Sequence, residues 1–567
     1  MSDRTIPIGI SDFSEIRQKN QYYIDKTGLI CSLLKKNPVK VTLITRPRRF
    51  GKTLAMSMLA HFFDIREDST VLFHGLAIEQ ETELCAKWQN RYPTIFLTFK
   101  DVDGLNFESA FGMLRMQLSS LFIEHNYLLK SEKIDENEKA LFRLVADAAN
   151  KNPSESLLKT SISLLMRMMA VYYGKPVILL IDEYDVPLAK ASTHGYYQEM
   201  LEIMRAMMST CLKDNRNLSF AVVTGCLRIA KESIFTGTNN FVSDTISRTR
   251  LNEYFGFTQA EVDRLLADFA QTKEAEKIKA WYDGYHFGDF DIYCPWDVLN
   301  YLYDLQNGSG IRKPVSYWKN TSDNAVIRTF IDHKRNTITN KMETLMNGGY
   351  IFQRIEDNMT YDFDRCSDDN FWSVLYLTGY LTRCRDTELT ETDKRLLEEE
   401  DLTALRIPNE EIREIYKDTI IKWFQDTAPS LRPEKLYEAV WAGDDQTATS
   451  EMTRLLKRTI SFYDYGESFY HAFLAGIFTG AGYAVESNRE HGMGRSDVVV
   501  SDSDHDRTAV FEVKMVREKE KLEPACTAAL DQIREQEYAE AYSEQYSEVR
   551  CYGIAFYKKE CLIKTAH

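Results

Sequence analysis

The sequence predicts an α/β protein with a parallel-sheet domain at the N-terminus, a mainly helical middle region and a smaller α/β domain at the C-terminus. At 567 residues the chain is too long for one hydrophobic core, so two to four domains are expected. Hydrophobic residues make up 44% of it and aromatic residues 12%, which excludes an intrinsically disordered protein. The change of pattern along the chain places the expected domains at 1–250, 251–450 and 451–567.

Continuous apolar runs predict the strands of the first domain. Strands buried on both faces read as unbroken apolar segments, and long helical stretches between them indicate parallel pairing. The predicted strands are VTLIT (41–45), PTIFLTF (93–99), VILLI (177–181) and LSFAVVT (218–224), and a helix is expected from about Lys52.

The rest of the chain divides into a helical and a mixed part. Residues 251–450 contain segments typical of helices, among them 261–270, 297–305 and 410–424. The last part predicts a helix over 466–479, strands over 497–501 and 508–515, a helix near 527–543 and a strand over 551–557. This order is that of a small α/β domain.

The charge of the chain is uneven. The formal net charge is −15, which argues against a polyanion-binding surface along the whole chain. Residues 1–60 nevertheless hold eleven Lys and Arg against four Asp and Glu, a balance of +7. The segment 386–418 is strongly acidic and reads as solvated helical surface.

Targeting and cysteine patterns favour a cytoplasmic protein. The N-terminus lacks the basic and apolar segments of a signal peptide, and no apolar run approaches the ~20 residues that cross a bilayer. We therefore expect no membrane partner. The ten cysteines are scattered without a CxxC pair, which indicates reduced thiols rather than disulfides or a zinc site.

A phosphate-binding loop follows the first predicted strand. RPRRFGKT combines a glycine-containing turn with a helix that starts at GKT, and such turns hold phosphate with backbone N–H groups. Lys52 is expected to reach the β- and γ-phosphates, and the Thr53 hydroxyl to coordinate Mg²⁺. The predicted nucleotide-binding residues of this loop are Arg49, Phe50, Gly51, Lys52 and Thr53. Arg46 stands where the usual motif has its first glycine, so the loop is expected to have a different shape. In that shape Arg46, Arg48 or Arg49 could also face phosphate or a nucleic acid.

The run VILLIDEYD supplies the second half of such a site. Asp182 is expected to hold Mg²⁺ through water, and Glu183 to polarise the attacking water. An additional strand between the two motifs is typical of P-loop proteins with a catalytic glutamate. Thr224, at the end of a later strand, is the predicted γ-phosphate sensor. Arg228 is predicted to contact the γ-phosphate in the same or a neighbouring subunit, although a surface salt bridge accounts for it equally well.

A second group of acidic residues near the C-terminus predicts a metal-dependent phosphodiesterase. Glu512 and Lys514 stand at i and i+2 on one strand, so their side chains emerge on the same face, and Asp497 lies on the preceding strand. Asp497 and Glu512 would bind Mg²⁺ or Mn²⁺, while Lys514 would orient water or neutralise charge. Glu467 on the helix before them is expected to complete the metal shell.

The same C-terminal pattern is compatible with a site that has no catalytic role. An ordinary hairpin with exposed carboxylates would produce it. His471 is expected to be a packed or surface histidine rather than a site residue. Gln532, on the following helix, is a candidate accessory residue that touches DNA or water.

In the order of its motifs, the chain resembles a bacterial family with an N-terminal AAA-ATPase-like domain and a C-terminal PD-(D/E)XK nuclease domain. The segments that carry the resemblance are IPIGISDFSEIRQKNQYYIDKT, RPRRFGKT, LLIDEYD, TGCLRIAKESIFTGTNN, WYDGYHF, CPWDVLNYL, LRIPNEEI, ESFYHAFLAG, SNREHGMGRSDVVV and FEVKM. The resemblance implies a P-loop NTPase fold and a restriction-endonuclease-like fold. It places the nucleotide site at Lys52, Thr53, Asp182 and Glu183, and the nuclease site at Glu467, Asp497, Glu512 and Lys514.

Our hypothesis is an ATP-binding and ATP-hydrolysing protein coupled to a metal-dependent nuclease that acts on DNA. The alternative is a nucleotide-dependent switch or binding module whose nuclease-like domain binds nucleic acid or protein without cleavage. A homo-oligomer is compatible with either. The YYIDKT motif (Tyr23, Asp25 and Lys26) receives no role, and WYDGYHF (281–287) is expected to be aromatic core between the first domain and the helical middle.

Overall fold

The computed structural model describes residues 4–35, 39–229, 241–308, 313–318, 339–356, 368–427, 433–459, 467–491, 494–536, 542–543 and 545–566. The chain forms two units, one of Met1–Tyr317 with Phe352–Glu411 and one of Trp318–Ile351 with Ile412–His567. Among the described residues no helix is both long and apolar enough to cross a membrane.

A five-stranded parallel sheet is the centre of the first unit. Its order is β2-β3-β4-β1-β5, and every neighbouring pair is parallel. The strands are β1 (Val41–Thr45), β2 (Thr94–Thr98), β3 (Val177–Asp182), β4 (Leu218–Gly225) and β5 (Phe241–Asp244). The four predicted strands are confirmed, and β5 is an additional one. β4 separates β1 from β3, so both motif-bearing strands border it.

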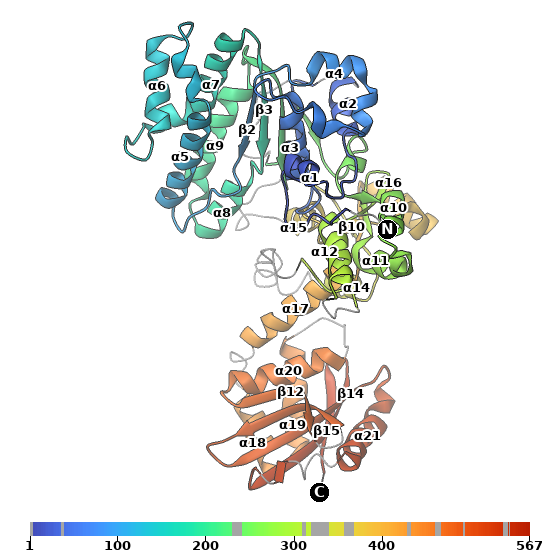
Figure 1. The fold of residues 1–567 in the computed structure, drawn as a ribbon. Coiled ribbons are helices and arrows are strands. Elements are labelled where there is room, and N and C mark those ends of the chain that lie inside the picture. Colours follow the sequence, from blue (N-terminus) through green and yellow to red (C-terminus); the bar gives the residue numbers. More distant parts are fainter. Residues whose placement is uncertain are drawn as a thin grey trace. The chain divides into compact units, whose positions relative to one another are not determined.

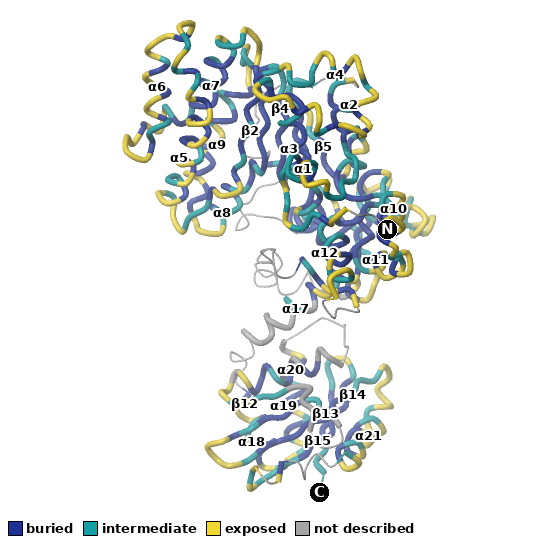
Figure 2. Tube along the Cα trace, in the orientation of Figure 1, coloured by how far each residue is buried: buried dark blue, intermediate teal, exposed yellow. Residues whose placement is uncertain are grey.

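Helices cover both faces of this sheet (Figure 1). α3 (Lys52–Phe63), which starts at the predicted residue, packs against β2 and β3, while α7 (Glu155–Tyr173) and α9 (Tyr197–Leu212) contact β3 and β4. Because helices lie on both faces, every residue of β1 and β3 is buried. The region of this sheet is largely dark blue, the colour of buried residues, in Figure 2. The other helices before residue 250 are α1 (Phe13–Gln18), α2 (Gly28–Lys35), α4 (Thr82–Trp88), α5 (Phe107–Glu124), α6 (Glu136–Ala146) and α8 (Val186–His194).

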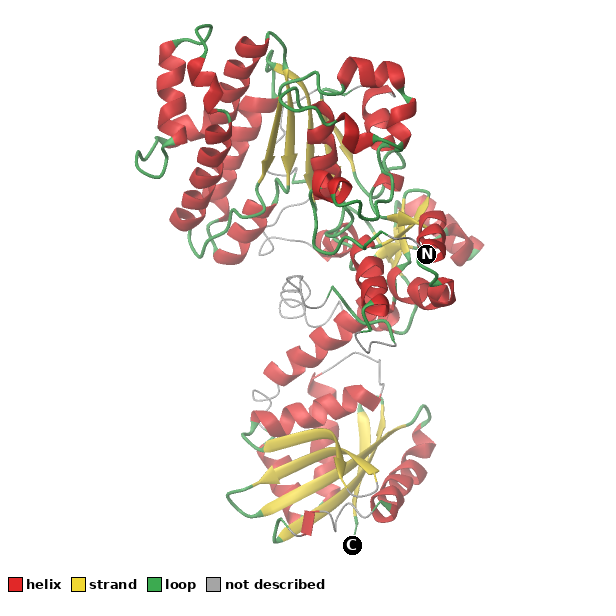
Figure 3. Ribbon diagram, in the orientation of Figure 1, coloured by secondary structure: helices red, strands yellow, loops and turns green. Residues whose placement is uncertain are grey.

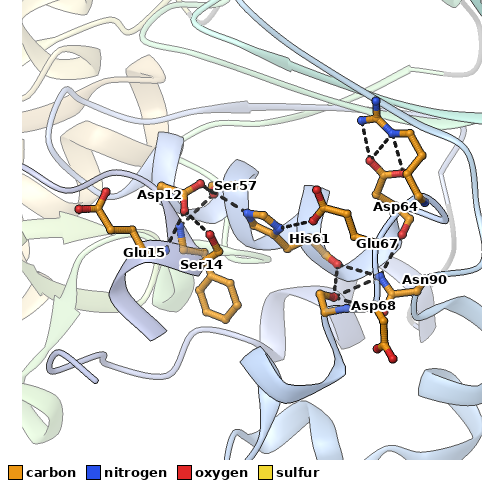
Figure 4. A network of polar contacts seen from close by, with 12 residues as sticks. Asp12, Ser14, Glu15, Ser57, His61, Asp64, Glu67, Asp68 and Asn90 are labelled. Carbon is orange, nitrogen blue, oxygen red and sulfur yellow. Dashed lines mark hydrogen bonds and ion pairs between the residues drawn. The ribbon is translucent and has the colours of Figure 1, made fainter. Parts of the chain in front are cut away.

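The N-terminal segment is bound to the helix that follows the loop (Figure 4). Asp12 caps α1 by accepting the Glu15 N–H at 2.8 Å, and its other oxygen accepts the Ser57 hydroxyl of α3 at 2.9 Å. His61, also on α3, lies 3.4 Å from Asp12 and 3.3 Å from Glu67. The SDFSEI motif therefore fixes α1 against α3 through polar contacts.

The YYIDKT motif also has a structural role. Asp25 accepts the hydroxyl of Thr27 at 2.6 Å and the N–H of Ala77 at 2.6 Å. Lys26, largely buried, forms a 2.6 Å ion pair with Glu261. The motif thus ties three distant segments of the first unit together.

The middle of the chain contains more strand than the sequence predicted. Two three-stranded sheets occur there, β6-β8-β7 and β10-β11-β9. Their strands are β6 (Phe257–Thr258), β7 (Tyr285–Phe287), β8 (Phe290–Tyr293), β9 (Ile351–Gln353), β10 (Thr382–Arg383) and β11 (Thr403–Arg406). The helices are α10 (Gln259–Asp268), α11 (Ala275–Tyr282), α12 (Pro295–Gln306), α14 (Thr339–Met346), α15 (Asp368–Leu377), α16 (Glu391–Glu400), α17 (Glu410–Thr427), α18 (Glu434–Ala442) and α19 (Asp445–Thr459).

The C-terminal sheet has the order β12-β13-β14-β15-β16, and among its described pairs only β14 and β15 are parallel. Its strands are the yellow arrows near the C-terminus in Figure 3. Its elements are α20 (Glu467–Gly480), β12 (Ala484–His491), β13 (Gly494–Asp502), β14 (Arg507–Met515), α21 (Leu522–Glu535), β15 (Glu548–Tyr557) and β16 (Glu560–Thr565). β12 and β16 were not predicted, and α21 begins and ends earlier than expected. Val510 packs with Leu530 of α21 and Phe511 with Phe478 of α20, so the alternation along β14 places these helices on opposite faces.

A buried ion pair joins the two strands at one edge of the first sheet. Arg46 is fully buried and pairs with Asp244 at 2.7 Å, and it also donates to the carbonyls of Thr45 and Asp244 at 2.8 Å. The guanidinium lies 5.2 Å from the Phe255 ring centroid. Arg46 therefore connects β1 to β5.

We expect Asp244→Ala to destabilise the first unit by about 3–5 kcal/mol, because it leaves the Arg46 charge buried without its partner. The double variant Arg46→Met with Asp244→Leu should lose less, since it removes both charges. Urea denaturation measures both effects, with the exposed Asp289→Ala as the control. An unchanged unfolding transition in Asp244→Ala would contradict the structural role of the pair.

Candidate active sites

The phosphate loop lies between β1 and α3 and depends on Gly51. This residue precedes α3 with φ of +84°, a left-handed conformation that glycine adopts without strain. The Lys52 side chain is buried, and its Nζ donates to the carbonyls of Arg46 and Pro47, both at 2.9 Å. The Lys52 ammonium group is therefore bonded to the loop itself, and it would have to release these two carbonyls to reach a phosphate.

Asp182 is the meeting point of the nucleotide-site residues. It ends β3, is fully buried, and accepts the Thr53 hydroxyl at 2.8 Å. Its other oxygen accepts the hydroxyl of Thr224, which lies near the end of β4. Thus β3, β4 and the first turn of α3 present one carboxylate and two hydroxyls at the carboxyl edge of the sheet. Oxygen donors of this kind are the ligands that Mg²⁺ prefers.

Glu183 follows Asp182 and has a strained backbone. Its φ of +53° lies in the left-handed region, which non-glycine residues occupy chiefly where the surrounding structure forces them to. Burial raises the pKa of its carboxyl, Asp182 and Asp185 add to this, and Lys52 opposes it. A carboxylate of raised basicity beside a metal-binding aspartate is suited to accept a proton from water.

The remaining residues of the DEYD motif hold the segment that follows β4. Asp185 accepts the N–H groups of Cys226 and Leu227, both at 2.9 Å. The Tyr184 hydroxyl donates to the Leu227 carbonyl at 2.7 Å and accepts the Ile229 N–H at 3.0 Å. Neither Tyr184 nor Asp185 was among the predicted site residues. Their position directly after Asp182 and Glu183 in the sequence could have indicated that they lie at the same site.

The structure corrects the prediction for Arg46. It was a candidate to face phosphate or nucleic acid, but its charge is buried against Asp244. Arg48 is the exposed arginine of the loop, and its charge opposes the rise in the pKa of Glu183. Of the two, only Arg48 is accessible to an anionic ligand.

Three other predicted residues have their side chains elsewhere. Arg49 lies over the Trp296 ring and donates to the Tyr317 carbonyl at 3.4 Å. Phe50 is buried against Tyr285, with ring centroids 4.9 Å apart, and this contact makes WYDGYHF aromatic core beside the loop, as expected. Arg228 lies over the ring of Phe241, 6.0 Å from its centroid, and its described contacts do not join it to Asp182. The buried, apolar side chain of Phe50 leaves only the backbone of this residue to serve a phosphate.

The second candidate site lies where β13 and β14 run side by side. An oxygen of Asp497 accepts the Val513 N–H at 2.8 Å, and Lys514 forms a 2.8 Å ion pair with Glu512. Glu512 is 1% exposed, and its Oε2 has no hydrogen-bond partner in the described part of the chain. The two carboxylates and the lysine therefore lie close together, as the i, i+2 spacing predicted.

The pKa values of the two carboxyls differ in direction. Burial raises the pKa of Glu512 to about 7; Asp497 adds to this rise and Lys514 opposes it. Burial also acts to raise the pKa of Asp497, but the contact with His471 and the hydrogen bond from the Val513 N–H outweigh it, so the net shift is downward. Asp497 is therefore the stronger acid of the two, and Glu512 holds a proton more readily than an ordinary glutamate.

His471 is part of this site, contrary to the expectation of a packed or surface histidine. Its Nε2 lies 3.4 Å from Asp497 Oδ2, and its side chain is buried. The neighbouring Tyr470 fixes this stretch of α20, because its ring stacks on Phe556 at 4.0 Å and its hydroxyl donates to the Lys558 carbonyl at 2.8 Å. The position of a histidine on the helix before the acidic strands was the signal that sequence reasoning undervalued.

Two further predictions concern the helices of this unit. Glu467 is the first residue of α20, one turn before His471, but its side chain lies outside what the structure describes. Gln532 lies half-buried on α21, and no described contact joins it to the carboxylates.

The donor chemistry at this edge suits a hard divalent cation. The unpaired Oε2 of the buried Glu512 requires a compensating charge or proton, and Asp497 supplies a second carboxylate. Within the described ranges no three His, Cys, Asp or Glu side chains group as a complete metal cage. Mg²⁺ commonly binds through one or two carboxylates and keeps several waters, so two carboxylates can hold it.

Comparison with known proteins finds a matching family model for each end of the chain. Residues 7–235 match the model "AAA-ATPase_like: Predicted AAA-ATPase", and residues 465–566 match the model of the PD-(D/E)XK nuclease superfamily. The chain is also 25% identical over 576 residues to the "Uncharacterized protein in vnfD 5'region" of Azotobacter chroococcum mcd 1, an alignment that covers 98% of this chain and 97% of that protein. The resemblance seen in the motifs and the predicted fold class are confirmed.

We expect Glu512→Gln to stabilise the metal-free protein at pH 8 by on the order of 2 kcal/mol. A carboxyl whose pKa is raised by folding is harder to ionise in the folded protein, so stability falls as the pH rises from the ordinary value of 4.5 toward about 7. The glutamine avoids this loss. Thermal unfolding in EDTA at pH 8 and pH 5 measures the difference, which should nearly vanish at pH 5. Equal effects at both pH values would contradict the raised pKa.

Proposed function

We propose that this protein binds and hydrolyses ATP at the loop between β1 and α3 and cleaves DNA at the edge formed by β13 and β14, with a divalent metal at each site. One observation carries the nuclease half: Asp497, Glu512 and Lys514 meet at one edge, and a buried oxygen of Glu512 lacks a hydrogen-bond partner among the described residues. An ordinary hairpin would leave such carboxylates exposed to water instead.

In the ATPase half each residue has a task that its position supports. Lys52, freed from the loop carbonyls, binds the β- and γ-phosphates, and Thr53 and Asp182 would hold Mg²⁺. That ion neutralises charge on the phosphates when it is bound. Glu183 accepts a proton from the attacking water, for which its raised pKa suits it. Thr224 contacts Asp182 and responds to the γ-phosphate end of the site.

In the nuclease half Asp497 and Glu512 would hold the metal, which supplies Lewis-acid polarisation of the phosphate and a more acidic water. Lys514 is held by Glu512 and offers a positive charge to the scissile phosphate. His471 keeps Asp497 in place through the 3.4 Å contact. The Val513 N–H also donates to Oδ2 of this carboxylate at 2.8 Å.

DNA is the proposed substrate because the matched superfamily is one of nucleases and the site chemistry is that of phosphodiester hydrolysis. The presence of both sites in one chain supports coupling between the binding or hydrolysis of ATP and the cleavage of DNA. The rival function, a nucleotide-dependent binding module, requires that the C-terminal site bind without cutting.

For the nuclease, we expect the purified chain with Mg²⁺ or Mn²⁺ to cut plasmid or linear DNA. Asp497→Ala and Lys514→Ala should each reduce the rate by about 10²-fold or more, since each removes a group that acts on the phosphate or the metal. Asp504→Ala and Lys521→Ala, which change exposed residues of the same unit, serve as matched controls. DNA left intact by the wild type, together with Mn²⁺ binding that does not depend on Asp497, would favour the binding module.

For the ATPase, Lys52→Ala should abolish ATP binding, and Glu183→Gln should retain binding while hydrolysis falls by about 10²-fold. Equilibrium dialysis with labelled ATP and release of phosphate measure the two steps separately. The exposed Lys19→Ala is the control. Hydrolysis that survives Lys52→Ala would show that another site or a contaminant is responsible.

A further inference from the structure

The charges of the C-terminal unit are separated along the strand that carries two of the nuclease residues. The segment 502–507, where β13 ends and β14 begins, holds three aspartates against one arginine. At the other end of β14 the segment 514–519 (KMVREK) holds three Lys and Arg against one glutamate. Glu512 and Lys514 lie near this basic end. The proposed metal site is therefore at the positive end of β14 rather than at the negative one.

Two segments leave the sheet side by side at this basic end. β14 and β15 are parallel, and their register pairs Met515 with Phe556. Two residues further along the chain come Arg517 after β14 and Lys558 after β15. Lys559 follows, so a second basic segment lies next to the first. Five of the twelve Lys and Arg after residue 466 lie in these two segments.

The cations of these segments form what we call the basic rim, which consists of Lys514, Arg517, Lys519, Lys558 and Lys559. An ion pair of 2.5 Å between Lys519 and Glu560 joins the two segments. Glu518, the other acid of these segments, pairs with Lys521 at 2.9 Å. Both pairs are open to water, where such pairs contribute little stability, so a phosphate can take the place of either carboxylate. The rim has five positive charges against these two acids, and this local excess attracts a polyanion.

The turn that carries Lys558 does not by itself require a lysine. Tyr557 and Glu560 are paired across the β15–β16 hairpin, so Lys558 and Lys559 form a two-residue loop. Lys558 has a φ of +51°, a left-handed conformation in which glycine, asparagine and aspartate are favoured. Asp506, in the turn before β14, has the same φ of +51° and is one of these residue types. The side chain at position 558 is therefore better explained by its charge than by the shape of the turn.

Helix α20 connects the hairpin to the proposed metal site. The Tyr470 hydroxyl donates to the Lys558 carbonyl at 2.8 Å, and the Tyr470 ring stacks on Phe556 with centroids 4.0 Å apart. The next residue, His471, lies 3.4 Å from Asp497. One turn of α20 thus holds both the turn that carries the rim and a carboxylate of the proposed metal site.

The rim lies within reach of a substrate bound at the proposed site. Arg517 is five residues beyond Glu512, and five residues of extended chain span at most about 17 Å. A DNA duplex rises about 3.4 Å per base pair, so this length corresponds to about five base pairs. A duplex with one phosphate at Lys514 therefore has other phosphates close enough to contact the rim.

We propose that the basic rim binds the phosphate backbone of DNA beside the bond that is cut. Arg517, Lys558 and Lys559 are positioning residues: they hold flanking phosphates, while Lys514 faces the scissile one. The inference rests on the proposed nuclease function and adds the surface by which the substrate is held. It also explains how a chain with a formal net charge of −15 binds DNA, because the positive charge is concentrated at one edge.

The test is DNA binding by the full chain after three rim charges are removed together, by Arg517→Ala, Lys558→Asn and Lys559→Ala. Fluorescence anisotropy of a labelled DNA duplex in EDTA measures binding without cleavage at several salt concentrations. We expect the Kd to rise about tenfold or more. The slope of log K against log salt concentration should fall by about 1 for each lost phosphate contact, or about 3 in total. Asparagine suits the left-handed φ of residue 558, so the melting temperature should not fall.

Cleavage in Mg²⁺ separates positioning from chemistry. The triple variant should raise the KM for the duplex about tenfold and leave kcat within about twofold of the wild type, because the metal ligands and Lys514 are unchanged. Glu518→Gln should have the opposite effect and lower the Kd, since it removes an acid from the two segments. Arg534→Ala on α21 and Lys457→Ala on α19 are matched controls: each removes an exposed positive charge from the same unit, and neither should change the Kd or the salt slope.

Binding and cleavage together distinguish the rim from the nuclease. A wild type that binds and cuts DNA, with a triple variant of unchanged KM and salt slope, overturns the rim but leaves the nuclease standing. An equal loss of binding in Arg534→Ala or Lys457→Ala also overturns the rim, since any surface charge would then serve. A wild type that neither binds nor cuts DNA overturns the nuclease function, and this inference fails with it.

Discussion

The nucleotide half of the molecule is organised around one carboxylate. Asp182 accepts the hydroxyls of Thr53 and Thr224, and these residues come from the first turn of α3 and from β4. Because the sheet is parallel, the carboxyl ends of β3 and β4 lie at the edge from which the loop after β1 also emerges. The buried strands, the helices that cover them and the segment after β4, which Tyr184 and Asp185 hold by hydrogen bonds, keep Asp182, Thr53 and Thr224 together.

Buried acids that the protein does not fully compensate recur in both units. Glu512 has an oxygen without a partner in the described chain, and Glu183 has a raised pKa on a strained backbone. Such groups lower the stability of the free protein and are more common at functional sites than elsewhere. The buried guanidinium of Arg46 also has one nitrogen, Nε, without a partner among the described residues, but its charge is paired with Asp244 and it donates to two carbonyls, which is consistent with a structural role.

The predictable part of the fold follows from burial. β1 to β4 are continuous apolar runs, and a sheet that is covered by helices on both faces requires that pattern. β5 (FVSD) is short and partly exposed, and β12 (AVESNREH) is largely polar, so neither shows the pattern of a buried strand. They form because a neighbouring strand supplies the hydrogen bonds, which no local composition encodes.

The amino-acid sequence was sufficient to specify which chemical groups exist and how short segments present them. GKT after an apolar strand, DE at the end of another, and E-x-K on a third identify Lys52, Thr53, Asp182, Glu183, Glu512 and Lys514, because strand and helix periodicity fixes neighbours within a few residues. Partners that lie far apart in the chain emerged from the three-dimensional packing alone. Arg46 meets Asp244 198 residues later, and His471 meets Asp497 across two elements. Packing of whole elements makes these contacts, and an arginine in a loop or a histidine on a helix looks the same in sequence whether it faces a ligand, a buried acid or water.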